Sequence, residues 1–256
     1  MQSACAQQLV ATVEKITGFR VVVGTADDIA EDAQMISARP ELPVHTINVS
    51  KSKLRYADYI VASQCAMLLR LWADASRIPV FTPIVEKVRY FNDRTAKAKP
   101  LSQLPASLAQ QTATRFSQGL LHQLRSMPAE ILAVRDCGEL CPDLEALQVE
   151  AVESHLRFLS EVFAPKIRAL APDQMWRSNV SMNAAFALNW AELSGSSLAM
   201  LPYESAGFSD VATRLLGEAK ARSAKTTEAY TGLVDAWAEH VGLRTLYRWE
   251  YRNGKQ

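Results

Sequence analysis

Histidine and cysteine are the side chains most able to bind a metal ion or attack a substrate, and this sequence contains few of them. The histidines are His45, His122, His155 and His240. No two of them are four residues apart, the spacing that places two imidazoles on one face of a zinc-binding helix. Cys137 and Cys141 are separated by three residues, which lies within the range of zinc-binding pairs. With His122 and His155 these cysteines are a candidate Cys₂His₂ site, although no second pair at a fixed spacing accompanies them.

Nucleophilic catalysis has no local signature in this sequence, because the Gly-x-Ser-x-Gly turn that presents a catalytic serine is absent. A hydrolase with a dispersed active site, using Cys65, Glu204 or a histidine, is an alternative that only the folded chain could assemble. We therefore predict no catalytic residue, no bound metal and no cofactor.

The first hundred residues alternate between helical and extended patterns. We expect a helix at 7–17, a strand at 19–23, a helix at 25–37 with acidic residues in its first turn, and a second strand at 45–49. A long apolar helix follows at about 52–75. It is apolar around most of its circumference, so it should be buried in the middle of the fold. Residues 77–83 read as a short extended piece, and the polar stretch 87–105 as an exposed loop or linker.

The remainder of the chain is helical almost throughout. We expect helices at about 104–125, 128–138, 142–170, 173–194, 207–222 and 224–242, followed by a final strand or an irregular wrap at 243–252. The predicted fold class is α+β and mostly helical, with a small strand-containing N-terminal part and a helical body. We place these parts at 1–100 and 101–256, packed as one unit.

A family resemblance rests on the strand at 45–50 and the apolar helix that follows it. This arrangement resembles the core of ImmA/IrrE-type zinc metallopeptidases, in which a strand leads into a buried helix carrying His-Glu-x-x-His. In that motif two histidines bind zinc, and the glutamate polarises the attacking water. The stretches 123–128 and 141–148 are similar to a downstream segment of such proteins. The resemblance implies a scaffold of the metallopeptidase type in residues 1–100.

The zinc motif itself is degenerate in this chain. The five aligned positions read Ser63-Gln64-Cys65-Ala66-Met67. A serine hydroxyl and a thioether cannot replace two imidazoles on zinc, and the amide of Gln64 cannot act as a general base. The resemblance therefore implies a non-catalytic pseudo-metallopeptidase that works as a protein-binding or scaffold component, with a partner whose identity the sequence leaves open.

The end of the chain mixes aromatic and basic side chains, a composition that is enriched at protein–protein interfaces. The candidate interface residues are Tyr247, Arg248, Trp249, Tyr251 and Arg252. Packing of these residues onto their own domain is the alternative.

Charge and composition restrict the remaining classes of function. The chain has 28 basic and 27 acidic residues, a net charge of +1, and so lacks the basic surplus typical of nucleic-acid-binding domains. A nucleic-acid-associated accessory protein that uses the basic patches at 51–55 and 87–99 is a further alternative. No apolar run reaches the roughly 20 residues that cross a bilayer. Four cysteines are too few for a disulfide framework, so we expect a cytoplasmic protein with reduced cysteines and no membrane contact.

Overall fold

The computed structural model describes residues 3–27, 29 and 32–253. The strands are β1 (Arg20–Ala26), β2 (Ala33–Ile36), β3 (Val44–Ser50), β4 (Ile78–Pro83) and β5 (Tyr247–Arg252). The helices are α1 (Ala4–Thr17), α2 (Ala57–Leu71), α3 (Val85–Ala96), α4 (Ala106–Leu140), α5 (Glu145–Ser160), α6 (Pro165–Leu170), α7 (Asp173–Ser194), α8 (Leu201–Ser205), α9 (Ser209–Ala221) and α10 (Thr227–Val241). The predicted class, α+β and mostly helical, is confirmed.

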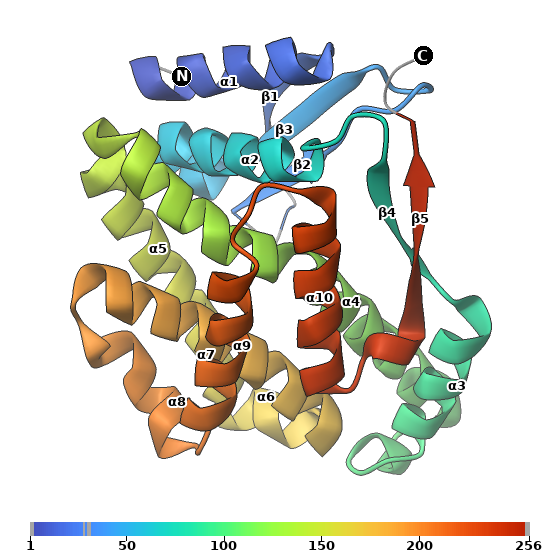
Figure 1. Ribbon diagram of the computed structural model, residues 1–256. Coiled ribbons are helices and arrows are strands. Elements are labelled where there is room, and N and C mark those ends of the chain that lie inside the picture. The colour runs from blue at the N-terminus through green and yellow to red at the C-terminus, as the bar shows by residue number, and fades with distance from the viewer. Residues whose placement is uncertain (1–2, 28, 30–31, 254–256) are drawn as a thin grey trace.

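The N-terminal part is a three-stranded sheet in the order β1-β3-β2, with α1 and α2 packed beside it (Figure 1). β1 pairs with β3 in parallel, and β2 pairs with β3 in antiparallel. Helix α1 begins where the side chain of Ser3 accepts a hydrogen bond from the N–H of Ala6, and it ends at Gly18, whose φ of 75° suits glycine. Because β2 pairs only with β3 among the described residues of this sheet, it is an edge strand.

Helix α2 is the buried central helix that the sequence predicts. Ten of its residues are buried, among them Tyr59, Ser63 and Met67, and they are distributed around most of the helix. A short 3₁₀ helix, Lys51–Tyr56, leads from β3 into α2. Burial around most of the circumference explains why this segment carries apolar residues in every turn.

Helix α4 contradicts the expectation of two helices at 104–125 and 128–138. It is continuous over 35 residues, with Pro128 inside it. A proline removes one backbone hydrogen bond and usually ends a helix. Here α4 packs against α2, α3, α7 and α10, and Pro128 itself is buried, so tertiary packing holds the helix through the proline. The expected helix at 142–170 is instead divided into α5, α6 and short 3₁₀ turns.

Two further expectations are wrong. The segment 25–37 is not a helix, because β2 occupies its second half and β1 extends into its start; residues 28, 30 and 31 of it lie outside the described residues. The polar stretch 87–105 is not a loop, because its first half continues α3. In α3 the charged residues cover the outer face while Val88 and Phe91 pack on the core, so its polarity reflects an amphipathic helix.

The second sheet joins two segments that are far apart in the sequence. β4 pairs in antiparallel with β5, and the two strands run side by side along one edge of the molecule (Figure 1). Of the two alternatives for 243–252, a final strand or an irregular wrap, the structure has a strand over Tyr247–Arg252, after a short 3₁₀ turn at Arg244–Leu246. One cluster of buried apolar residues extends from Ala6 to Tyr247 and so includes residues of both predicted parts. Among the described residues no helix is long and apolar enough to span a membrane.

The cysteines differ from the expectation of four reduced thiols. Cys5 and Cys141 form a disulfide that joins α1 to the end of α4, with their Cα atoms 5.6 Å apart, while Cys65 and Cys137 are free and buried. The pairing partners are 136 residues apart in the sequence, so no local spacing could indicate them.

Candidate functional site

A cavity of about 1160 Å³ lies between the N-terminal part and the helical body. Side chains of α2, α4, α5 and α7 line most of it, and β2, the β4–β5 sheet and Tyr230 of α10 complete the wall. A volume of this size is slightly larger than the roughly 300–1,000 Å³ that small-molecule sites occupy. The cavity is therefore the main candidate site.

The wall contributed by α2 contains the three positions that the resemblance assigns to zinc chemistry. Ser63, Gln64 and Met67 all line the cavity, since residues three and four apart share one face of a helix. Ser63 is nearly buried and Gln64 is half-buried. The side chain of Ser63 forms a hydrogen bond with the hydroxyl of Tyr59, whose pKa burial raises well above its ordinary value. At these three positions α2 therefore presents a hydroxyl, an amide and a thioether to the cavity, and none of these groups can act as a general base.

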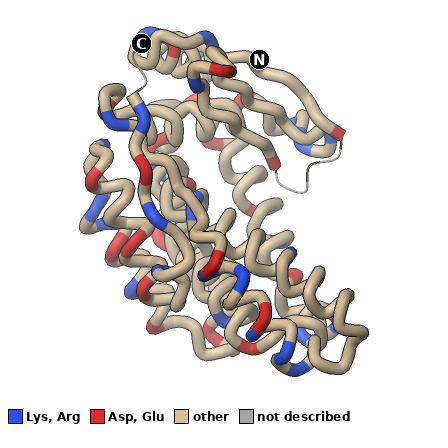
Figure 2. Tube along the Cα trace, turned by 90° about the vertical axis from the view of Figure 1, so that its right-hand side faces the viewer, with Lys and Arg blue, Asp and Glu red and all other residues tan. Residues whose placement is uncertain are grey.

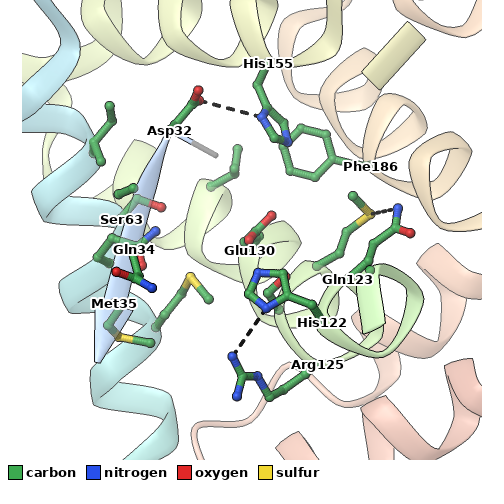
Figure 3. A pocket seen from close by; sticks show the side chains of 18 of the residues that line it. Asp32, Gln34, Met35, Ser63, His122, Gln123, Arg125, Glu130, His155 and Phe186 are labelled. Atoms are coloured by element: carbon green, nitrogen blue, oxygen red, sulfur yellow. Dashed lines mark hydrogen bonds and ion pairs between the residues drawn. The ribbon is translucent and has the colours of Figure 1, made fainter. Parts of the chain in front are cut away.

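On the wall facing α2, the cavity is lined by Glu130 and His122 of α4 and by His155 of α5 (Figure 3). Glu130 of α4 is central, and burial raises the pKa of its carboxyl above the ordinary value, although His155, His122 and a hydrogen bond from Ser126 oppose that rise. The Nδ1 atom of His155 lies 3.6 Å from a carboxylate oxygen of Asp32. Glu130 is thus a carboxyl group whose neutral form is favoured by burial in the cavity.

The contacts around this cluster orient its members. The other oxygen of Asp32 lies 3.0 Å from Nζ of Lys53, so the carboxylate is held between a cation and His155. The ring of His155 meets the ring of Phe186 edge to face, with centroids 5.3 Å apart. The Nε2 atom of His155 is buried without a hydrogen-bond partner among the described residues. His155 is therefore fixed on one side and has an unused ring nitrogen on the other.

A ladder of amide side chains forms another polar part of the wall. The side-chain NH₂ of Asn179 donates to Oε1 of Gln123 at 3.1 Å, and that of Asn183 donates to Oδ1 of Asn179 at 3.1 Å. These groups come from α4 and α7, and they line the cavity beside apolar side chains such as Phe158. Polar groups that alternate with apolar surface suit a ligand that has both amide groups and apolar side chains.

The edge of β2 supplies backbone groups to the same cavity. Residues 33–37 all line it. Ser50 donates its N–H to the carbonyl of Asp32 at 3.0 Å, so the antiparallel alternation directs the backbone groups of Gln34 and Ile36 toward β3. The same alternation directs the N–H and C=O of Ala33 and Met35 away from β3. These groups lie on the free side of the edge strand.

Two of the residues named for a dispersed hydrolase, Cys65 and Glu204, are not placed for catalysis. Cys65 is fully buried, and burial raises the pKa of its thiol to about 12, which is the opposite of an activated nucleophile. Glu204 lies exposed on α8 and does not line the cavity. The dispersed hydrolase remains an alternative only through the histidines and Glu130 of the cavity.

The candidate Cys₂His₂ site is wrong. Cys141 is bonded to Cys5, whereas His122 and His155 line the cavity. Within the described part of the chain, one group of three or more potential metal ligands has its ligand atoms within 4.8 Å of one another, and it consists of Cys5, Cys141 and Asp143.

The structure divides the five candidate interface residues near the C-terminus. Tyr247 is buried, stacks on Phe81 and donates to Asp235, so it belongs to the core. Trp249 and Arg252 line the cavity. Arg248 and Tyr251 are exposed. An interface at this end of the chain stays a prediction, without Tyr247 as a contact residue.

Of the two basic patches proposed for nucleic acid, the patch at 51–55 is neutralised by ion pairs. Lys51 pairs with Asp27 at 2.8 Å, Lys53 with Asp32, and Arg55 with Glu150. Along the tube in Figure 2, basic and acidic residues are interspersed. Ion pairing of this kind does not favour the accessory protein that would bind phosphate backbones.

Sequence reasoning missed several members of the site. Glu130, Asp32 and the edge of β2 were not singled out, because they come from separate segments whose proximity depends on packing. The sequence does contain a signal for Glu130, because it is an acidic residue within the apolar segment 129–134. Burying a carboxylate costs free energy unless the group is paired or hydrogen-bonded, so such a residue is a candidate for a specific role.

Comparison of the chain with protein-family models, with curated proteins and with solved structures found no match.

Proposed function

We propose that this protein is a non-catalytic pseudo-metallopeptidase that binds a partner protein, and that its cavity holds an extended segment of that partner. The observation that carries the proposal is that Ser63, Gln64 and Met67 line the same cavity as the free edge of β2. A zinc enzyme would need imidazoles at two of these positions and a carboxylate at the third.

An extended peptide is the occupant that best matches this wall. The outward N–H and C=O groups of Ala33 and Met35 need hydrogen-bond partners, and a peptide added to a sheet edge supplies them in the required alternation. The strand residues 33–36 correspond to roughly 13 Å of extended chain. A segment of about four residues would therefore lie along β2, with its side chains directed toward α2 and toward the amide ladder of α4 and α7.

The absence of zinc catalysis is tested first. We expect the oxidised protein, purified without chelator, to contain no zinc by elemental analysis and to leave a denatured protein substrate intact when zinc is added. Chelator-sensitive proteolysis would overturn the non-catalytic part of the proposal.

A variant that restores the zinc ligands tests whether the α2 positions correspond to a zinc motif. The triple substitution Ser63→His, Gln64→Glu and Met67→His should bind about one zinc per chain, because Glu130 on α4 can supply a carboxylate to the same cavity. A version with Val134→Glu added places a second carboxylate one turn further along the α4 wall. If both variants fold, as judged by circular dichroism, and neither binds zinc, the metallopeptidase-like assignment fails.

Peptide binding is tested with a synthetic library of random hexapeptides and fluorescence anisotropy. Methylation of single backbone nitrogens in a bound peptide should abolish binding at every second position, because only alternate N–H groups face β2. Gln64→Trp, which fills the cavity, should weaken binding by about tenfold or more. Gln103→Trp is the matched control, since Gln103 is exposed and does not line the cavity. Binding that is insensitive to methylation, or lost equally in both variants, would overturn the peptide site.

A further inference from the structure

A second group of reactive side chains lies outside the cavity, where the start of α1 meets the end of α4. The sulfur atoms of Cys5 and Cys141 and a carboxylate oxygen of Asp143 all lie within 4.8 Å of one another. Cys141 is fully buried, Cys5 is half-buried and Asp143 is exposed. The group is thus anchored in the core on one side and open to solvent on the other.

Neighbouring groups hold these side chains in place. The hydroxyl of Ser3 donates to the carboxylate of Asp143 at 3.0 Å, and the N–H of Ser3 donates to Asp58 at 2.6 Å. The N–H of Cys141 donates to the carbonyl of Cys137 at 2.9 Å, which fixes the backbone at the end of α4. The Ser3–Asp143 bond therefore joins the start of α1 to the turn after α4 independently of the disulfide.

The other two cysteines are not available for the same chemistry. Cys65 and Cys137 are buried in the core, and burial raises the pKa of each thiol to about 12. Thiolate chemistry in this chain is therefore confined to Cys5 and Cys141.

We propose that Cys5, Cys141 and Asp143 form a site with two states: a disulfide when oxidised, and a binding site for Zn²⁺ when reduced. Reduction by a dithiol transfers two electrons and two protons to the protein disulfide and leaves the dithiol as its own disulfide. The two thiols then release two protons as their thiolates bind the metal, the Asp143 carboxylate is the third ligand, and water from the solvent side completes the tetrahedron.

The geometry suits zinc in particular. A tetrahedral zinc ion with Zn–S bonds of about 2.3 Å holds its two sulfur ligands about 3.8 Å apart, and a carboxylate oxygen at a similar separation. The three ligand atoms already lie within 4.8 Å of one another, so small side-chain rotations suffice. Ca²⁺ and Mg²⁺ prefer oxygen ligands and do not fit two thiolates. In both states the site joins α1 to the end of α4.

The test uses the full chain reduced with a phosphine, because a dithiol would itself compete for zinc. The phosphine is oxidised to its oxide with an oxygen from water, and the protein gains two thiols. After removal of the phosphine without air, we expect about one equivalent of Zn²⁺ to bind, and Co²⁺ in its place to give the charge-transfer absorption of thiolate ligands. The oxidised protein should bind neither ion.

Variants distinguish this site from any other. Cys5→Ser should abolish the Co²⁺ thiolate absorption, and Asp143→Asn should weaken Zn²⁺ binding by about tenfold or more. Glu145→Gln is the matched control, because Glu145 is an exposed acid of the adjacent turn, and it should leave binding unchanged. If the reduced wild type binds no metal, or if binding survives Cys5→Ser, the proposal is overturned and the pair is a structural disulfide. None of these outcomes depends on the cavity, because the zinc assay of the proposed function uses the oxidised protein.

Discussion

At the scale of single residues, His45 illustrates how burial assigns a role to a histidine that the sequence leaves open. Its ring is fully buried between α1 and the sheet. The N–H of Ala38 donates to Nδ1 at 3.0 Å, and Nε2 lies 3.0 Å from the hydroxyl oxygen of Thr17. A donor at Nδ1 requires the neutral ring with its proton on Nε2. His45 is therefore a structural residue.

The pKa of His45 predicts how the stability of the protein depends on pH. Burial, with a smaller contribution from the charge of Arg252, lowers the pKa of the ring from 6.5 to about 4. The unfolded chain therefore binds one more proton than the folded chain between these values, and the free energy of unfolding falls as the pH falls through this window. Over about 2.5 pH units the free energy of unfolding falls by about 3 kcal/mol through this group.

We expect the wild type to lose about 3 kcal/mol more stability between pH 7 and pH 4 than the variant His45→Asn does, as measured by urea denaturation. His240→Asn is the control, since His240 is exposed on α10 and takes no part in the buried hydrogen bonds of His45. An imidazole signal of His45 that titrates near pH 6.5 by NMR would contradict the prediction.

The residues of the site show where sequence reasoning ends. Ser63, Gln64 and Met67 were singled out because the resemblance aligns them with the zinc-motif positions, and their helical spacing places them on one face. Glu130 and Asp32 join them only through the packing of α4 and β2 against α2. A single sequence does not show which residues of separate segments lie close together in the fold.

At the scale of elements, the sequence predicted segments whose ends and periodicity agree. α1, α2, α7, α9 and α10 were expected within a few residues of their bounds, because apolar residues recur along each of them at helical spacing. Glycines also mark the ends of α1, α7 and α10. β2 was missed because its pairing with β3 supplies the hydrogen bonds that make it a strand. α3 was missed because its many charged residues were taken to indicate an exposed loop, although its apolar residues recur at helical spacing.

Asp235 on α10 connects that helix to β5 and so positions Trp249 in the wall of the cavity. One carboxylate oxygen accepts hydrogen bonds from the hydroxyl of Tyr247 at 2.6 Å and from the indole N–H of Trp249 at 2.9 Å. The other lies 3.1 Å from Arg244. Hydrogen bonds to a charged group contribute about 1.5–3 kcal/mol each when they are buried.

We expect Asp235→Ala to lower the free energy of unfolding by about 2–4 kcal/mol, because it leaves the donors of Tyr247 and Trp249 without their acceptor. Asp210→Ala is the control, as Asp210 is exposed on α9 and should change stability by about 0.5 kcal/mol or less. Urea denaturation followed by circular dichroism measures both. A loss of less than about 1 kcal/mol in Asp235→Ala would show that β5 is held mainly by its pairing with β4.

At the scale of the whole molecule, the two predicted parts share their core and are joined at three separate places. β5 returns from the end of the chain to pair with β4, the cavity wall draws residues from both parts, and the disulfide connects α1 to α4. Arg70 of α2 and Asp136 of α4 add a buried two-pronged ion pair, with distances of 2.9 and 3.0 Å. Such long-range links cannot be predicted from periodicity, which reports only local structure.

The disulfide is the link whose contribution can be removed cleanly. Joining residues 136 apart restricts the unfolded chain, and native disulfides that close long loops stabilise by about 2–5 kcal/mol. In the presence of a chelator, Cys5→Ser should therefore unfold with a free energy about 2–5 kcal/mol below that of the oxidised wild type. The wild type reduced with a phosphine should match Cys5→Ser under the same conditions.

These two comparisons separate the covalent link from the packing of α1. Suppose that the reduced wild type is as stable as the oxidised protein, while Cys5→Ser is less stable than both. The disulfide would then contribute nothing to the free energy of unfolding, and the loss in Cys5→Ser would come from disturbed contacts around Leu140 and Ser3. If zinc then raised the stability of the reduced wild type but not that of Cys5→Ser, binding to the folded state alone would account for it, because a ligand stabilises the state that it binds. The gain should grow with the logarithm of the free zinc concentration, which distinguishes metal binding from re-formation of the disulfide.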